Sequence, residues 1–366
     1  MKKSYLMIAV AALAMASCAQ NDELNYDEFK EAAMEFNIDG IENATRAELT
    51  NDWFNTADNN FGVYGYKKAN FGEQIFNNEK VTAEGNKLWS HKTVRFWDKS
   101  VNTYNFYAYA PYNASGDVEF STSNGFTFKN LSIFAGDIAS GDYDKAIAWA
   151  TGIGYTNGTL STDLKHNNTP TVHFIFKHVL SKLQFKVKTD INEDVAKIYL
   201  QEIKAQLPTG TASWAQTSAT TASGSATYSS LVKASLVKEN ASGDVYASAD
   251  ASADAAKFAE QIFASTEASG DAVSATAAQK GNTYIVVPVD NTDETDHRFA
   301  IKVKYDIIYN DGTYEKDCYA LGAIKYAPNS NDFYTITINI NPAQIEFSVE
   351  SIDNWTNKDG VTIDVE

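Results

Sequence analysis

Short runs of aromatic and β-branched residues, each closed by turn-forming residues, constrain the fold of this chain most strongly. From Trp53 onward such runs recur at residues 61–66, 87–90, 94–97, 104–109, 118–120 and 126–128. Gly, Asn, Asp or Pro bounds them, as is typical of the short strands of an antiparallel sandwich. Because helical periods are few, the sequence predicts an all-β fold of two β-sandwich domains in tandem.

The second half of the chain continues the pattern after a linker-like patch at His166–Pro170. The predicted domains are therefore residues 47–168 and 169–342. Regular strands are expected at 283–289, 301–307 and 314–321, with Asn310-Asp311-Gly312 as the hairpin turn between the last two. The intervening tract, residues 209–280, is rich in Ala, Ser, Thr and Gly and is expected to be mostly loop or edge strand. Within it, Asp254–Phe263 has the spacing of one or two helical turns.

The first residues have the pattern of an export signal. Two lysines precede an apolar run, and small residues lead to Cys18. This predicts a secretory signal peptide over residues 1–17, because the segment is too short to span a membrane. Its end resembles a bacterial lipobox, and the resemblance implies a lipoprotein with a lipid on Cys18. Without Lys2 and Lys3 the net charge moves from -17 to about -19, which disfavours nucleic acid and anionic membrane surfaces as partners.

Residues 18–46 form a predicted propeptide with a first strand. Met34, Phe36, Ile38 and Ile41 are its apolar residues, and the polar, turn-like stretch after them contains Arg46. The chain has 3 arginines, at 46, 95 and 298. A protease could reach the backbone at such a stretch, so cleavage between Arg46 and Ala47 and an ordinary loop arginine both stay open as interpretations.

The terminal segment, residues 343–366, reads as two strands joined by a turn. Apolar residues alternate with polar ones in both strands, at Ile345, Phe347 and Val349 and again at Val361, Ile363 and Val365. Two interpretations follow. The strands close their own sandwich, or a strand is donated to the sheet of another molecule, where its backbone would supply the hydrogen bonds and its alternate side chains would fill pockets.

Catalytic and metal-binding patterns are weak. His173 and His178 are five apart on one expected strand and fall on opposite faces, and no paired-cysteine or phosphate-loop spacing occurs. We expect His178 to be a core residue, Cys318 to be a small buried group, and the acidic loop at 290–296 to be solvated. We therefore predict no enzyme, metal or cofactor, although paired carboxylates of a glycosidase leave no local signature. Exposed tryptophans would offer glycan binding instead.

Several segments taken in order resemble the fimbrillin-like lipoproteins of Gram-negative anaerobes, which are subunits of pili. These segments are Cys18, 45–47, 106–112, 142–146, 176–185, 284–288, 333–338, 345–349 and Trp355. The resemblance implies paired transthyretin-like sandwiches in an outer-membrane lipoprotein precursor. An arginine-specific protease would cut after Arg46 and remove the first strand, and a C-terminal strand of another pilin subunit would fill the opened groove.

Within that family the two chain ends favour a shaft subunit of an extracellular pilus that contributes to adhesion. The expected donor residues are Ile345, Phe347, Val349, Val361, Ile363 and Val365. Anchor and tip proteins would be further partners. The alternative is an uncut surface lipoprotein or tip adhesin that binds glycan or protein, which would require exposed Trp89, Trp97 or Trp214.

Overall fold

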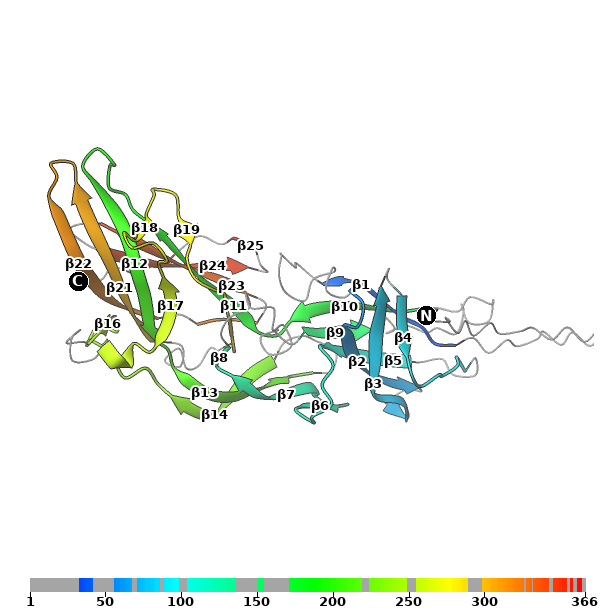
Figure 1. The fold of residues 1–366 in the computed structure, drawn as a ribbon. Helices are drawn as coiled ribbons and strands as arrows, with labels where there is room; N and C mark the ends of the chain where they lie inside the picture. Colours follow the sequence, from blue (N-terminus) through cyan, green and yellow to red (C-terminus); the bar gives the residue numbers. More distant parts are fainter. Residues whose placement is uncertain are drawn as a thin grey trace, which may run out of the picture.

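The protein consists of β-sheets connected by turns (Figure 1). The structure is a computed structural model and describes residues 33–41, 56–67, 71–85, 88–98, 104–135, 150–154, 171–218, 224–248, 255–288, 298–325, 327–330, 332–341, 345–353, 356–357 and 361–363. Regular structure in these ranges is β-strand apart from 3-10 helix at Phe71 and in η4 (Ala255–Lys257). The predicted all-β fold is confirmed. No helix in the described part of the chain is long and apolar enough to cross a membrane.

A seven-stranded sheet contains most of the first half of the chain, in the order β1-β10-β9-β5-β2-β3-β4. Its strands are β1 (Phe36–Ile41), β2 (Asn60–Lys67), β3 (Glu73–Gly85), β4 (Leu88–His91), β5 (Tyr104–Ala110), β9 (Ala150–Gly154) and β10 (Val172–His178). Neighbouring strands are antiparallel except for β1, which runs parallel to β10. β1 therefore forms one end of the sheet.

Both faces of this sheet are buried, as alternation along β5 shows. Phe106 and Ala108 belong to a cluster made by the sheet's own strands together with Trp97, so the sheet curls around that cluster. Tyr107 and Tyr109 belong to a second cluster, shared with a facing sheet in the order β14-β13-β7-β6. The strands of that sheet are β6 (Val118–Ser121), β7 (Gly125–Ser132), β13 (Thr209–Gln216) and β14 (Gly224–Val232).

The other half of the molecule is a second pair of sheets. One follows the order β25-β24-β23-β11-β20-β8, with β19 and β26 attached to β11 and β24. Its strands are β8 (Phe134–Ala135), β11 (Ser181–Lys188), β19 (Ala278–Gln279), β20 (Tyr284–Val286), β23 (Phe333–Ile340), β24 (Ile345–Asp353), β25 (Thr356–Asn357) and β26 (Val361–Ile363).

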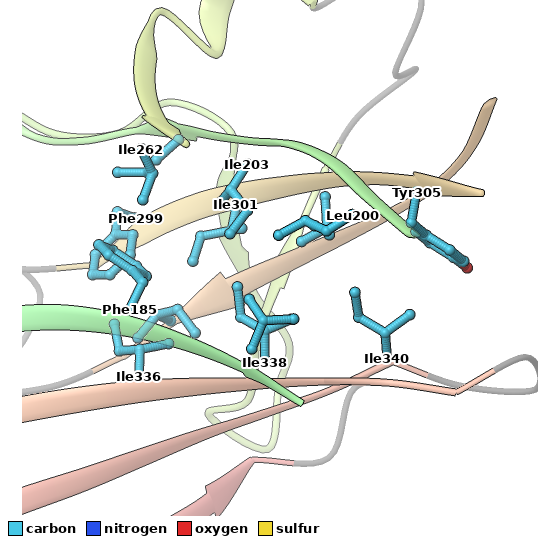
Figure 2. Packing of buried hydrophobic residues seen from close by; sticks show 14 of the residues in the cluster. Phe185, Leu200, Ile203, Ile262, Phe299, Ile301, Tyr305, Ile336, Ile338 and Ile340 are labelled. Carbon is cyan, nitrogen blue, oxygen red and sulfur yellow. The ribbon is translucent and has the colours of Figure 1, made fainter. Parts of the chain in front are cut away.

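The facing sheet follows the order β17-β12-β21-β22, with β18 beside β12. Its strands are β12 (Ala196–Gln206), β17 (Glu260–Ala264), β18 (Asp271–Ala272), β21 (Phe299–Tyr309) and β22 (Tyr314–Ile324), and a separate hairpin pairs β15 (Val237–Glu239) with β16 (Val245–Ala247). The predicted hairpin at Asn310–Gly312 joins β21 to β22. Figure 2 shows Ile336, Ile338 and Ile340 from β23 packed against apolar side chains of β12 and β21.

The Ala/Ser-rich tract contains more regular structure than its composition suggests. β13 pairs along its length with β14 and also with β7, and Ala212, Trp214 and Gln216 alternate inward. The predicted helical turns at 254–263 are wrong beyond Lys257, because β17 pairs with β12 there. Phe258 and Ile262 are nevertheless both buried, so their apolar spacing marked the core but not the type of element.

Strands from both sides of the predicted division at residues 168 and 169 share sheets. β10 follows the division and pairs with β1 and β9, which precede it. β13 likewise pairs with β7, and β8 pairs with β20. The two halves of the chain are therefore joined by backbone pairing as well as by the connecting segment.

Candidate functional site

The first strand occupies a groove at the end of the seven-stranded sheet. β1 pairs with β10 over the register Phe36 to Val172 through Ile41 to Phe176. On its other side, the Met34 amide donates a hydrogen bond of 2.8 Å to the carbonyl oxygen of Arg95. β1 and the residues just before it therefore lie between β10 and the segment that follows β4 (Figure 1).

Two side chains anchor this strand in the groove. Met34 and Phe36 are 2 % and 4 % exposed, and Ile38 packs against the same cluster from a half-buried position. Residues 34, 36 and 38 alternate as a strand with one apolar face requires. The apolar first strand predicted from the sequence is confirmed as β1, with Met34 two residues before its first residue.

Aromatic rings surround Phe36. Its ring centroid lies 5.3 Å from that of Phe76, 6.0 Å from Phe106, 5.9 Å from Phe174 and 5.1 Å from the imidazole of His91. Three of these contacts are edge-on, the geometry that aromatic pairs favour. Phe36 thus fills a pocket made by β3, β4, β5 and β10.

His91 also contacts the backbone of the strand segment. Its Nε2 lies 3.1 Å from the carbonyl oxygen of Met34, and its Nδ1 lies 3.0 Å from the carbonyl oxygen of Thr93. Glu79 on β3 fixes the Thr93 residue by accepting hydrogen bonds of 2.7 Å from the Thr93 amide and 2.7 Å from its hydroxyl. Thr93, itself fixed by Glu79, therefore contacts one ring nitrogen of His91, while the other ring nitrogen contacts the Met34 carbonyl oxygen.

Removal of β1 would uncover a matched set of apolar and backbone groups. Val172, Phe174 and Phe176 of β10 are fully buried members of the cluster that Met34 and Phe36 complete. The Val172 amide would also lose its 2.8 Å hydrogen bond to the carbonyl oxygen of Glu35. An empty groove would expose both kinds of group, and a new strand could satisfy both.

The C-terminal strands lie in a different sheet from this groove. β24 pairs with β23 over eight positions, from Phe333–Ile352 to Ile340–Ile345. Among the described residues β26 pairs with β24, and its three positions place Phe347 opposite Ile363 and Val349 opposite Val361. Four predicted site residues lie outside the described residues. They are Cys18, Arg46, Ala47 and the expected donor residue Val365.

Other residues singled out in the sequence have structural surroundings. His178 is 2 % exposed, and burial, with a smaller contribution from Lys182, lowers its pKa to about 3, so it is a neutral core residue as predicted. Cys318 is half-buried, and burial raises the pKa of its thiol, which disfavours the reactive thiolate. Within the described ranges, no group of three or more His, Cys, Asp or Glu could hold a metal ion.

The tryptophans considered for glycan binding are not free surface groups. Trp97 is 4 % exposed and Trp214 is fully buried. Trp89 is half-buried and packs against the apolar cluster that includes Phe36 and Phe174. Phe61 lies edge-on to Trp89 at 5.1 Å, and Phe128 lies 5.9 Å from Trp214. These side chains build the core of the two sheets of the first half.

The chain is an all-β molecule whose first described strand lies at one end of a seven-stranded sheet. A model described as fimbrillin-like matches residues 45–355, and the chain belongs to this family of fimbrial subunits. The Fimbrium subunit Fim1C of Phocaeicola vulgatus is 26 % identical over 220 residues, which are 55 % of this chain. The match spans about half the length of that relative, 56 %.

The fold is similar to that of a solved structure. A fimbrial protein from Bacteroides vulgatus superposes with a TM-score of 0.51 at 18 % sequence identity, and the match covers 88 % of this chain and 99 % of that one. The resemblance to fimbrillin-like proteins predicted from the sequence is thus confirmed. His91 was missed as a groove residue, because its partner Met34 lies 57 positions away in the chain and no local motif joins the two.

Proposed function

We propose that this chain is a shaft subunit of a surface pilus and that it polymerises by strand exchange. The precursor carries a lipid on Cys18 in the outer membrane. An arginine-specific protease cuts between Arg46 and Ala47, which frees residues 18–46 together with β1. The C-terminal strand of a second subunit then enters the groove beside β10, and the resulting filament contributes to adhesion.

The observation that carries this proposal is the position of β1. It pairs with β10 at the end of a sheet, and it reaches the core through Phe36, with Met34 buried two residues before it. Burial of each such side chain contributes roughly 1.5–3 kcal/mol. These contacts therefore hold β1 in the groove of the uncut precursor. After cleavage between Arg46 and Ala47, β1 is no longer covalently joined to the rest of the protein, and another strand can replace it.

The groove calls for apolar residues at alternate positions, as at 34, 36 and 38 of the resident strand. Both C-terminal strands have this spacing, at 345, 347 and 349 and at 361, 363 and 365. β24 repeats the order aliphatic, aromatic, aliphatic, but it is paired with β23 over eight positions. β26 is paired over three positions, so its release breaks fewer backbone contacts. We therefore assign Val361, Ile363 and Val365 as the donated residues.

The geometry of donor and groove favours an open filament. The groove lies in the seven-stranded sheet and the C-terminal strands lie in the eight-stranded one. A subunit that donates from one surface and receives on another makes heterologous contacts, which continue from copy to copy unless the rotation closes a ring.

The burial of Trp97 and Trp214 removes two of the three tryptophans that an aromatic glycan site would have used.

The test is cleavage of the purified residue 19–366 protein with an arginine-specific protease, followed by N-terminal sequencing and sizing in mild detergent. We expect one new N-terminus at Ala47 and a ladder of multimers. Arg95 donates its Nε–H to the carbonyl oxygen of Ile75, and Arg298 pairs with Glu239, so both are structurally engaged.

Matched variants separate cleavage from donation. Arg46→Ala should remain uncut and monomeric, whereas Arg95→Lys should be cut and polymerise. Ile363→Asp should be cut but should not polymerise, and Phe347→Asp should change polymer yield less if β26 is the donor. A cut protein that stays monomeric with its C-terminus intact would refute strand exchange.

A further inference from the structure

Two exposed apolar side chains lie beside the start of β1. Val94 and Phe96, in the segment that follows β4, are 56 % and 47 % exposed. The backbone of Phe96 forms an antiparallel bridge with Ala33, and the Arg95 carbonyl oxygen accepts a hydrogen bond of 2.8 Å from the Met34 amide. The two apolar side chains therefore lie at the end of the groove where β1 begins.

The segment that carries these two side chains is fixed at both of its ends. The amide and the hydroxyl of Thr93 each donate a hydrogen bond of 2.7 Å to Glu79. Trp97 is 4 % exposed, and its ring lies edge-on to that of Tyr104 at 4.8 Å. Because the backbone between residues 93 and 97 is already ordered, a partner that binds residues 94 and 96 pays little entropy for ordering it.

The direction of β1 determines the side from which a replacement strand enters. β1 runs parallel to β10, with its first residue, Phe36, opposite Val172. A strand that replaces β1 and recovers the same backbone contacts runs in the same direction, so the residues before it leave the groove at the Ala33 end, beside Phe96. With residues 361–365 as the donated strand, the folded part of the donor subunit therefore approaches the recipient at Phe96.

We propose that Val94 and Phe96 are a contact surface for a second copy of this chain, namely the subunit whose C-terminal strand fills the groove. The part of that subunit which they contact is β24 and β25, because these strands come just before the donated one. β24 and β1 belong to different sheets in the two halves of the molecule (Figure 1). The contact therefore joins the first half of the recipient to the second half of the donor. This inference rests on the proposed strand exchange and adds a surface that orients the two subunits.

The charges on the two surfaces are complementary. Lys92 and Arg95 are exposed and flank the apolar pair on the recipient. β24 contains Glu346, Glu350 and Asp353 and has no lysine or arginine. The whole chain has a net charge of -17, so two copies repel each other over most of their surfaces. A site that combines two cations with two apolar side chains is therefore a place where a second acidic copy can approach.

The test places a photoreactive benzophenone amino acid at position 96 of the residue 19–366 protein. After cleavage and polymerisation, irradiation should link neighbouring subunits, and mass spectrometry should locate the link within residues 345–357 of the second copy. The control carries the same amino acid in place of the exposed Ala114, which follows β5 at the sheet end that is aligned through β9 with the far end of β10. It should give no such link.

Two other outcomes of this experiment would overturn the proposal. Links from position 114 and none from position 96 would mean that the donated strand enters in the opposite direction. Links from position 96 only to residues 18–46 would mean that the released segment, and not a second copy, covers the surface.

A substitution separates the contact surface from the groove itself. Phe96→Ser should slow polymerisation of the cut protein about tenfold, because a half-exposed aromatic side chain is no longer buried between the subunits. A synthetic peptide of residues 359–366 contains the donated strand without β24 and β25, so its affinity for the emptied groove should stay within about twofold. Val232→Ser removes another exposed apolar side chain, on β14, and should change neither quantity. An equal loss of peptide binding in Phe96→Ser would contradict a role at the subunit surface.

The two proposals fail in different ways. Polymers that form at the same rate in Phe96→Ser, with no link from position 96, would remove the contact surface and leave strand exchange in place. Cut protein that stays monomeric and does not bind the peptide would refute strand exchange, and the contact surface with it.

Discussion

Truncation of Phe36 is the sharpest perturbation of the groove. Phe36 is 4 % exposed and contacts the rings of Phe76, His91, Phe106 and Phe174. Replacing a buried Phe by Ala in a core costs about 3–5 kcal/mol, which includes the cavity that remains. Because β1 is an end strand, we expect Phe36→Ala to release β1 before the rest of the protein unfolds.

The magnitude determines the assay. Each 1.4 kcal/mol is about a tenfold change in an equilibrium constant, so a cost of about 3 kcal/mol predicts a loss of roughly 100-fold in the protection of β1 amides. Hydrogen–deuterium exchange read by mass spectrometry resolves such a loss on peptides that contain residues 33–41. Peptides from β12 and β21 should exchange as in the unaltered protein, since their core is a separate cluster.

Glu35→Ala is the matched control, because Glu35 is the exposed neighbour of Phe36 in the same segment. It should leave β1 protection nearly unchanged. The reasoning would be refuted if Phe36→Ala left β1 protected. It would also fail if β1 lost protection only when the entire seven-stranded sheet did, because β1 would then not be a separable strand.

Two further substitutions test the fold around the groove and the second pair of sheets. Trp214→Ala should destabilise the protein by about 3–5 kcal/mol in urea unfolding, because Trp214 is fully buried in the cluster that its sheet shares with the tyrosines of the facing sheet. A loss below about 1 kcal/mol would contradict its place in that core. In the other half, a hydrogen bond from Lys280, 2.8 Å from the carboxylate, and one from Ser265 hold the pKa of Asp271 below its usual value. A lowered pKa stabilises the fold at neutral pH, and that contribution disappears as the pH falls through the pKa of the folded state. Lys280→Met should therefore cost up to about 1 kcal/mol at about pH 7 and less at about pH 3, and an equal cost at both would contradict the assignment.

Local patterns in the sequence were sufficient for many of the strands outside the Ala/Ser-rich tract, for several turns and for the first strand of the groove. The alternation at Met34, Phe36 and Ile38 marks an apolar face without reference to any partner. Asn310-Asp311-Gly312 marks a hairpin because Gly312 takes a φ of +87°, which few residues other than glycine adopt readily. The family resemblance likewise rests on the order of short segments, which the sequence displays directly.

Pairing between distant segments required the tertiary structure. β13 has the composition of a loop tract, and only its register with β7 and the pocket for Trp214 make it an inner strand. The apolar spacing of Phe258 and Ile262 suits a helix or a bent strand. Residues 260–264 form the strand β17 because their backbone pairs with that of β12. Both outcomes depend on long-range backbone contacts that no local window contains.

The candidate site divides in the same way. The sequence by itself determined that residues 34–41 include an apolar strand and that residues 343–366 include alternating strands, because side-chain alternation is a property of neighbouring residues. The tertiary structure decided that the first strand runs parallel to β10 and that the Phe36 ring enters an aromatic pocket. It also decided that His91 contacts the carbonyl group of Met34. The sheet curls around its apolar cluster, so the end of β4 lies near the start of β1, and this curling results from the packing of many side chains together.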